Sequence, residues 1–210
     1  MTLWAVWVGF AFTYFSMVMA ITRIFDEEGN DEDGPDFDYL AIFISSASEF
    51  LGTAIAIEVV DRIGRIKALV CAFLLGGGSM FMVCIFNGVL TKNFIVAFAF
   101  ISRASGMAAA CITWISTAEL LSTNVRSTGH AAANSVARCG AFLSPFLVNE
   151  GSLDTIGVSL LIVSILAALA SSTLPETSGI ELGKAIIIEE QEEIRRIESG
   201  EEPMKNGFWG

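Results

Sequence analysis

The sequence predicts an all-α, polytopic membrane protein with six transmembrane helices, and three observations support that fold class. Of the 210 residues, 53% are hydrophobic and 17% are charged, a balance more apolar than that of an ordinary soluble domain. Apolar runs of about 20 residues recur, and each can cross the roughly 30 Å hydrocarbon core of a bilayer as a helix. Most of the acidic residues behind the net charge of −11 lie outside these runs, in residues 26–38 and 176–202.

Six apolar runs are expected to span the bilayer. They cover about residues 2–25, 39–60, 68–90, 94–118, 127–148 and 155–174. Together they are expected to form one transmembrane bundle over residues 1–175, with short connections that favour antiparallel neighbours. Small residues within the runs, such as Ser45, Gly52, Gly76 and Gly106, allow helix backbones to approach closely in lipid.

Polar residues delimit the first three runs. The first run is apolar from its start and has no basic segment or small-residue cleavage site before Arg23, so it is interpreted as a spanning helix rather than a signal peptide. The acidic stretch 26–38 separates it from the second run. The basic stretch 61–67 separates the second run from the third.

The last three runs lead into a polar tail. Lys92 stands before the fourth run and Arg126 before the fifth, and the sixth run ends at Leu174. Residues 176–210 are expected to form a cytoplasmic tail. Within it, Leu182, Ile186, Ile187, Ile194 and Ile197 stand among many glutamates, which predicts an amphipathic surface helix over residues 180–197. The last residues are expected to be disordered.

Basic residues indicate the orientation, because they are retained on the cytoplasmic side of membrane proteins. The connections after the second and fourth runs, and the tail, contain Arg62, Arg65, Lys67, Arg126, Lys184, Arg195, Arg196 and Lys205. The opposite side has only Arg23 and Lys92 between its runs. Both termini are therefore expected in the cytoplasm, in a membrane that the pattern does not identify.

The sequence argues against several other classes of protein. Its four cysteines, Cys71, Cys84, Cys111 and Cys139, lie inside apolar runs without a C-x-x-C spacing, and His130 is the only histidine. A metal site or a disulfide framework is therefore not expected. No nucleophile–base pair and no phosphate loop is present. The chain is predicted to be no enzyme, to need no cofactor and to bind no nucleic acid.

Three charged residues lie where a membrane helix should have none: Glu49, Arg103 and Arg138. At 1.5 Å per residue, each lies about 13–16 Å from an end of its run, near the bilayer midplane. A charge there costs several kcal/mol unless it faces the bundle interior and is paired. The three residues are interpreted either as a buried structural salt bridge or as part of a pathway for substrate or a coupling ion. Glu49 is the candidate proton-coupling or cation-sensing acid, since no other acid is central.

Neighbouring side chains extend this polar stripe. Asn134 shares a helix face with Arg138, and Trp114 shares one with Arg103. Tyr14 adds a hydroxyl in the first run. The predicted substrate or coupling pathway therefore consists of Glu49, Arg103, Asn134, Arg138, Trp114 and Tyr14.

Three motifs now indicate a family. Residues 61–65 read D-R-I-G-R, which resembles the D-[RK]-x-G-R signature of the major facilitator superfamily in its second half. Glu119 and Arg126 are similar to the family's E-x-x-P-x-x-x-R-[ST]-x-G, although Ser122 replaces the proline. Residues 175–179 read P-E-T-S-G, similar to P-E-T-K-G. The three motifs occur in the family's order, each at the expected place between helices.

The resemblance covers about residues 1–182 and matches the six runs to helices seven to twelve of the superfamily. Residues 10–15, 48–50 and 137–141 resemble its synaptic-vesicle-two-related and organic-ion branch, which is sugar-porter-like. The first run lacks the paired glutamines of hexose porters, which argues against a hexose carrier.

The resemblance implies transport of a small organic solute, which could be an organic ion, a sugar-like molecule or a carboxylate. Two six-helix bundles would rock in the lipid bilayer about a midplane site, with an ion driving symport. A cytoplasmic gate would be formed by Asp61, Arg62, Gly64, Arg65, Glu119 and Arg126. The alternative for these charged residues is that they only enforce topology.

A complete transporter of this type needs about twelve spans at about 20 residues each plus loops. The chain is therefore expected to require a missing N-terminal six-helix half or a second chain, and its apolar start at Met1 favours truncation. The alternative function is a non-transporting six-helix protein that regulates a full-length transporter.

Overall fold

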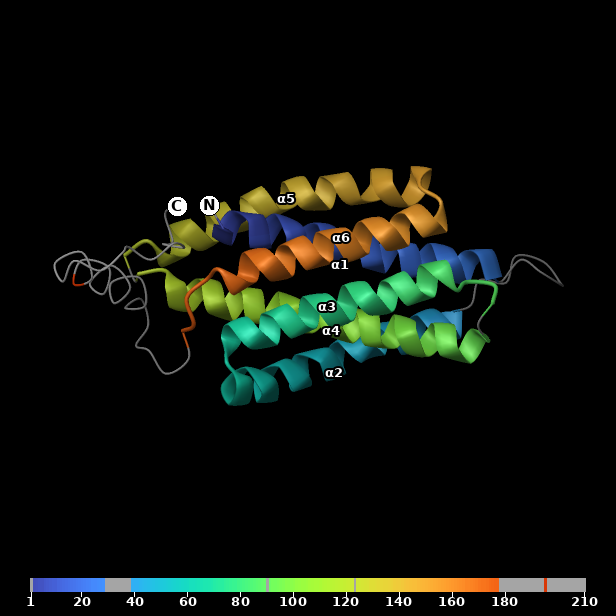
Figure 1. Ribbon diagram of the computed structural model, residues 1–210, viewed down its shortest axis with the longest axis horizontal. Coiled ribbons are helices and arrows are strands. Elements are labelled where there is room, and N and C mark those ends of the chain that lie inside the picture. Colours follow the sequence, from blue (N-terminus) through green and yellow to red (C-terminus); the bar gives the residue numbers. More distant parts are fainter. Residues whose placement is uncertain (1, 29–38, 90, 123, 178–194, 196–210) are drawn as a thin grey trace.

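A computed structural model describes residues 2–28, 39–89, 91–122, 124–177 and 195, and all regular structure in this part of the chain is helical (Figure 1). The prediction of an all-α chain with six long helices is thus confirmed. In chain order the helices are α1 (Thr2–Glu28), α2 (Tyr39–Ile63), α3 (Arg65–Ile85), α4 (Lys92–Leu120), α5 (Arg126–Glu150) and α6 (Leu153–Ser172).

The helices run roughly antiparallel in one bundle, with α2 and α5 at opposite edges (Figure 1). α3 packs mainly against α6 and α4, whereas α1 packs mainly against α5 and α6. α2 rests on α4, and α5 rests on α1. One end of the bundle holds the start of α1, the α2–α3 and α4–α5 connections and the end of α6. We call it the turn end.

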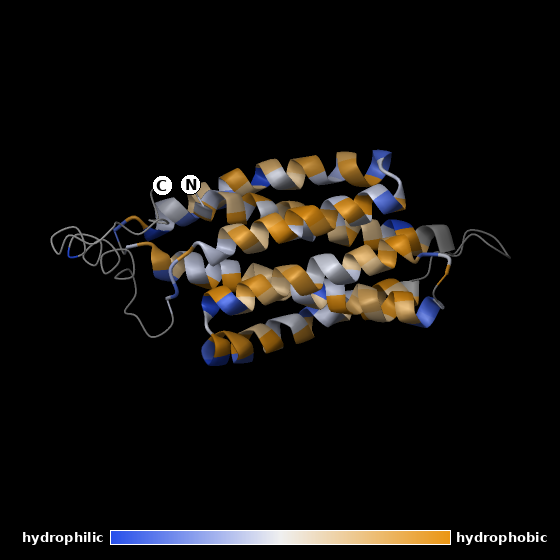
Figure 2. Ribbon diagram, viewed as in Figure 1, coloured by the Kyte–Doolittle hydropathy of each residue, from blue (hydrophilic) through white to orange (hydrophobic). Residues whose placement is uncertain are grey.

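The helices are apolar along most of their length and polar at their ends (Figure 2). Within the described residues, five helices are long and apolar enough to cross a membrane, and α5 is not among them. The fifth span was expected at residues 127–148. α5 occupies that place, but Asn134, Arg138 and several small polar residues lower its hydropathy. The polar residues of α5 therefore distinguish it from the other five helices.

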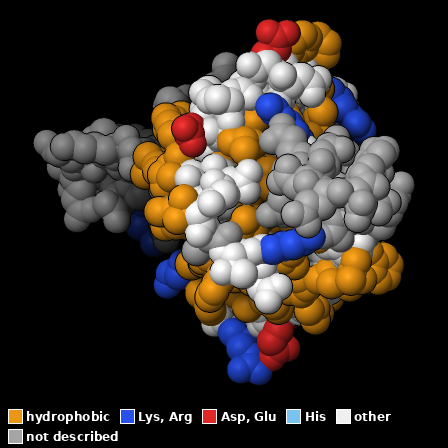
Figure 3. Space-filling model, turned by 90° about the vertical axis from the view of Figure 1, so that its right-hand side faces the viewer, with side chains coloured by type: hydrophobic (Ala, Val, Ile, Leu, Met, Phe, Trp, Pro, Cys, Tyr) orange, Lys and Arg blue, Asp and Glu red, His pale blue; other side chains and the backbone are white. Residues whose placement is uncertain are grey.

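Large apolar side chains are found both inside the bundle and on its surface. Trp7, Ile112 and Leu160 are almost fully buried, whereas Phe50 and Phe142 are exposed. Helices that are apolar on all sides are typical of membrane spans, because lipid takes the place of water around them. Figure 3 shows the end opposite the turn end, where charged side chains lie among hydrophobic and uncharged polar ones.

Helix boundaries differ from the expected spans where charged motifs extend the helices. α2 continues to Ile63 and α3 begins at Arg65, so the charged motif lies in two helix ends joined by Gly64. Gly64 has a φ of +100°, a conformation that glycine adopts without the strain that a Cβ would cause. α3 ends at Ile85 instead of near residue 90, because Gly88, with φ +85°, turns the chain.

The expected amphipathic segment at residues 180–197 lies, apart from Arg195, outside the described residues, and so does the expected disordered end.

Candidate functional site

Glu49 of α2 and Arg103 of α4 form an ion pair in the middle of the bundle. Nη2 of Arg103 lies 2.6 Å from Oε1 of Glu49, and Nε of Arg103 donates to the same oxygen at 3.2 Å. The Tyr14 hydroxyl of α1 donates to this oxygen as well, at 3.4 Å. The Arg103 side chain is only 9% exposed and that of Glu49 26%. Each charge is thus compensated by the other, as burial in a membrane demands.

A close helix crossing places this pair. A Cβ on Gly52, one turn after Glu49, would collide with the backbone carbonyl of Ala104, next to Arg103. α2 and α4 can therefore approach backbone to backbone at this point. On the other side of α4, the Ser102 hydroxyl donates to the Gly76 carbonyl of α3 at 3.2 Å, which fixes the rotation of α4.

Arg138 of α5 does not join the pair, although sequence reasoning placed all three charges at one depth. α5 packs on α1 rather than on α2, so Arg138 faces a different side of the bundle. Its side chain is exposed, and within the described residues it makes no hydrogen bond or ion pair. Gly140 permits the α1–α5 contact, because a Cβ there would collide with the Val8 carbonyl.

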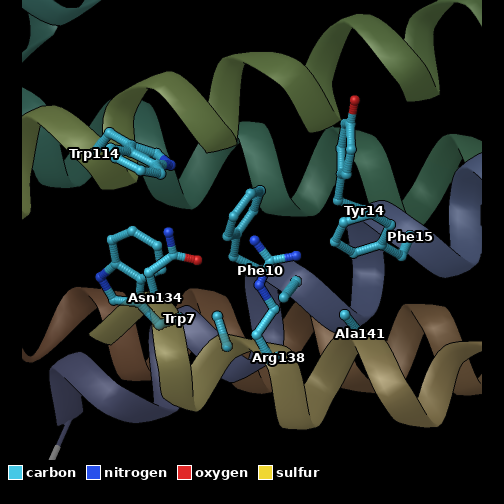
Figure 4. A pocket seen from close by; sticks show the side chains of 10 residues that line it. Trp7, Phe10, Tyr14, Phe15, Trp114, Asn134, Arg138 and Ala141 are labelled. Atoms are coloured by element: carbon cyan, nitrogen blue, oxygen red, sulfur yellow. The ribbon is translucent and has the colours of Figure 1, made fainter. Parts of the chain in front are cut away.

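The Arg138 side chain points into a pocket of about 180 Å³ between α1, α4 and α5 (Figure 4). Asn134 extends from the same helix toward this space. Most of the remaining wall is aromatic: Trp7, Phe10, Tyr14, Phe15 and Trp114. An apolar pocket with a few convergent polar groups is the usual form of a small-molecule site. Four of the six predicted pathway residues, Tyr14, Trp114, Asn134 and Arg138, line this pocket.

An aromatic cluster stiffens the pocket toward the turn end. The ring centroids of Trp7 and Trp114 lie 5.3 Å apart, and His130 lies 4.4 Å from Trp114 and 5.2 Å from Trp7. The Trp7 indole donates to the Thr117 hydroxyl at 2.9 Å. Sequence reasoning missed Trp7. Its spacing with Phe10 and Tyr14, at three and seven residues, was the available signal for a shared helix face.

A second charged group at the turn end surrounds Arg65, and we call it the Arg65 cluster: Asp61, Arg65, Glu119, Glu176 and Thr177. Arg65 donates from Nε and Nη2 to the Glu119 carboxylate, with nitrogen–oxygen distances of 3.1–3.3 Å. Both side chains are largely buried. Asp61 lies 3.5 Å from Arg65 and is 74% exposed, so its attraction is screened by solvent.

The segment after α6 completes this cluster. The Glu176 carboxylate accepts from the backbone N–H of Arg65 at 2.8 Å and of Ile66 at 3.2 Å, and so caps the start of α3. The Thr177 hydroxyl donates to Glu119 at 2.5 Å. The ends of α2, α3, α4 and α6 are thereby tied together within this single bundle.

Two predicted gate residues lie outside the Arg65 cluster. Arg62 pairs with Glu58 one turn earlier on the exposed side of α2. Arg126 donates to the Leu121 carbonyl at 3.4 Å instead of meeting Glu119, because it begins α5 directly beside the end of α4. Gly64 supplies the turn that brings α3 to Glu176.

The described residues contain no group of three or more His, Cys, Asp or Glu side chains that could hold a metal ion. The cysteines are unpaired thiols. The arrangement offers an internal ion pair and an aromatic pocket lined by Arg138, which has no partner among the described residues, and these are means of binding a solute.

The family described as "Sugar (and other) transporter" matches residues 1–185 of this chain. The synaptic vesicle 2-related protein of Pongo abelii is 29% identical over an alignment covering 99% of this chain and 40% of that protein. Organic cation/carnitine transporter 7 of Arabidopsis thaliana is 32% identical and covers 88% of this chain and 39% of that protein. The inward-open xylose transporter XylE from E. coli aligns with a TM-score of 0.67 at 18% identity.

The structural alignment covers 95% of this chain and 52% of XylE, so the fold is that of about half a major facilitator transporter, as predicted. The chain spans about 40% of the length of the curated relatives named above. The matching family and the Arabidopsis thaliana relative are described as transporters, in agreement with the prediction that the chain is no enzyme. The family match and the long apolar helices identify an integral, multi-pass membrane protein.

Proposed function

Because this chain belongs to the sugar (and other) transporter family, we propose that it forms one half of a secondary transporter. The complete transporter would move a small organic solute across a membrane by alternating access between two six-helix bundles. The observation that carries this proposal is the aromatic pocket at mid-bundle, which is open at the surface and contains Arg138, an arginine with no partner among the described residues.

We assign the chain to the C-terminal half of such a transporter, with the turn end in the cytoplasm. Support comes from the three motifs, whose residues gather at the turn end. That end also carries Arg62, Arg65, Lys67 and Arg126, which basic-residue retention places on the cytoplasmic side. A missing N-terminal half, or a second chain, would complete the solute site.

The Arg65 cluster would serve the gate by holding four helix ends as one rigid unit. The contacts described for this cluster join helices of one bundle, so rocking against another bundle need not break them. The proposed role is therefore to keep the cytoplasmic ends together while the whole bundle tilts. The alternative, that these charges only enforce topology, predicts no effect of Glu119 on transport.

Glu49 would be the group that senses the coupling proton. Its carboxylate holds Arg103 and Tyr14, and protonation would release both partners. A proton gradient could in this way alter the contact between α2 and α4. In uptake assays, Glu49→Gln should abolish the dependence of transport on external pH. An unchanged pH profile with normal expression would contradict this role.

The function is tested by isolating the native polypeptide with an antibody against residues 180–205. The size of the band shows whether the native chain is about twice this mass, as twelve spans require. The isolated protein is then placed in proteoliposomes, and uptake of labelled carnitine, xylose and benzoate is measured with an inward proton gradient. Saturable uptake of any one of them is expected.

No uptake of any of the three, together with co-purification of a separate twelve-span transporter, would contradict the proposal. That result would favour the alternative of a regulatory partner that does not transport. The size of the immunoblot band narrows the cases before any transport is measured. A band of about twice this mass would exclude a separate six-helix regulator. A band of this chain's own mass would fit a half-transporter or a regulator, and the uptake assay then separates these two.

A further inference from the structure

α5 presents a line of polar side chains that begins at the turn end and reaches mid-bundle. Arg126, His130, Asn134 and Arg138 follow one another at four-residue spacing, which keeps them on one side of a helix. Arg138 and Asn134 line the aromatic pocket. Asn134, His130 and Arg126 line a second pocket of about 640 Å³. The two pockets share Asn134 and Trp114, so they adjoin.

The charge along this line is positive, and none of the residues that the structure describes neutralises it. Neither pocket has an acidic residue in its described lining. The two carboxylates of α2 and α4 that lie inside the bundle are already engaged, since Glu49 holds Arg103 and Glu119 holds Arg65. The acids of α5 and α6, Glu150 and Asp154, lie at the opposite end of the bundle.

Several nitrogen atoms on this line have no hydrogen-bond partner. Nη2 of Arg126 and Nε2 of His130 are buried and unpartnered. In the described part of the chain, the Arg138 guanidinium has no partner either. An unpaired cation inside a bilayer is costly, so residues of this kind mark sites where an ion or solute supplies the missing charge. A guanidinium matches a carboxylate in shape and can bind both of its oxygens.

We propose that the transported solute is an organic anion bearing a carboxylate, and that α5 offers it two successive binding positions. Arg138 binds the carboxylate at mid-bundle, where the aromatic wall receives the apolar body of the solute. Arg126 binds it near the turn end on the way in or out. Twelve residues separate the two, about 18 Å along the helix. This inference rests on the proposed transport function and specifies its substrate class.

The test uses the native polypeptide in phosphatidylcholine nanodiscs, which contain no anionic lipid that could occupy the sites. The probes are 4-nitrobenzoate and its neutral analogue 4-nitrobenzamide, which have the same ring. Both quench tryptophan fluorescence, and Trp114 lies in the wall of both pockets. We expect the wild-type protein to bind the carboxylate at least about tenfold more tightly than the amide.

Three variants locate the effect. Arg138→Gln should remove the preference for the carboxylate while leaving binding of the amide unchanged. Arg138→Lys should keep part of the preference, which separates loss of charge from loss of fold. Arg126→Gln should weaken carboxylate binding by a smaller factor. Arg62→Gln is the matched control, because Arg62 is exposed and pairs with Glu58 outside both pockets, and it should change nothing.

Equal affinities for the two probes in the wild-type protein would overturn the proposal. A carboxylate preference that persists in Arg138→Gln would also overturn it. So would a preference that is seen only in nanodiscs to which anionic phosphatidylglycerol has been added. Uptake of a neutral solute without a carboxylate preference would overturn only this inference. A carboxylate preference in a protein that transports nothing would contradict the proposed function and leave the anion site standing.

Discussion

Arg103 and Arg138 lie at similar depth in the bundle, but they differ in burial and in ion pairing. Arg103 is almost buried and bound to Glu49, whereas Arg138 is exposed beside aromatic rings with no partner among the described residues. The difference comes from the neighbouring helix. α4 faces α2, which presents an acid, and α5 faces α1, whose described residues in the wall of the pocket are aromatic or alanine. The helix that a mid-membrane charge faces therefore decides whether the charge forms a structural ion pair or remains available to bind a solute.

The largest expected effect is on the free energy of unfolding, which should respond differently to loss of the Arg103 partner and to loss of Arg138. Glu49→Ala leaves Arg103 buried without a counter-charge, which should lower the free energy of unfolding by about 3 kcal/mol. Arg138→Ala removes no partner and should change it by less than about 0.5 kcal/mol. Thermal unfolding of the purified protein in detergent, followed by tryptophan fluorescence, measures both. Similar losses in the two variants would show that the pair is not what distinguishes these arginines.

The next effect concerns the helix crossing that makes the pair possible. Gly52→Ala forces a methyl group against the Ala104 carbonyl, so it should cost about 1–3 kcal/mol and weaken the ion pair. Gly78→Ala is the matched control, because a Cβ there meets nothing within 4 Å. In the control, greater helix propensity should leave stability equal or raise it by about 0.5 kcal/mol. If both variants lost the same stability, close approach of α2 and α4 would not position the pair.

A smaller effect, on the rate of uptake, is expected when the Arg65 cluster is altered. Glu119→Gln removes the charge that binds Arg65, and the remaining amide can still accept hydrogen bonds from Arg65 and Thr177. We expect initial uptake rates in proteoliposomes to fall several-fold while the expressed amount stays near that of the wild-type protein. Normal rates would support the view that these charges only set topology.

The smallest effect is expected for Asp61→Asn. Asp61 is 74% exposed and 3.5 Å from Arg65, and exposed pairs contribute about 0.2–1 kcal/mol. Asp61→Asn should shift the balance of conformations and slow uptake less than Glu119→Gln does. Raised salt should reduce the difference in uptake rate between Asp61→Asn and the wild-type protein. A larger effect of Asp61 than of Glu119 would indicate that Asp61 meets a residue of the other half of the transporter.

The sequence predicted the helices well because an apolar run of membrane length rarely forms anything but a spanning helix. It also predicted that Glu49 and Arg103 would lie at one depth. It could not show that Arg138 stands apart, because depth along a helix says nothing about the direction in which a side chain points. That direction depends on which helices touch, here on crossings at Gly52 and Gly140.

The motifs at the turn end were predictable in position but not in pairing. Several bases and acids gather there, and only the fold shows that Glu119 meets Arg65 while Arg126 meets the Leu121 carbonyl. The part played by Trp7 was missed for a related reason. A tryptophan in an apolar run resembles any other core residue until Trp114 and His130 are seen against it.

The contacts of Glu176 and Thr177 give the chain that follows α6 a mechanical role. These two residues hold the start of α3 and the carboxylate of Glu119, and the polypeptide continues from them into the acidic tail. Tension on that tail, or a new charge placed on it, would act first on the joint between four helices. A regulator bound to the tail would then need no access to the solute pocket, because the tail is attached to the Arg65 cluster, which joins the ends of the helices that line and support the pocket.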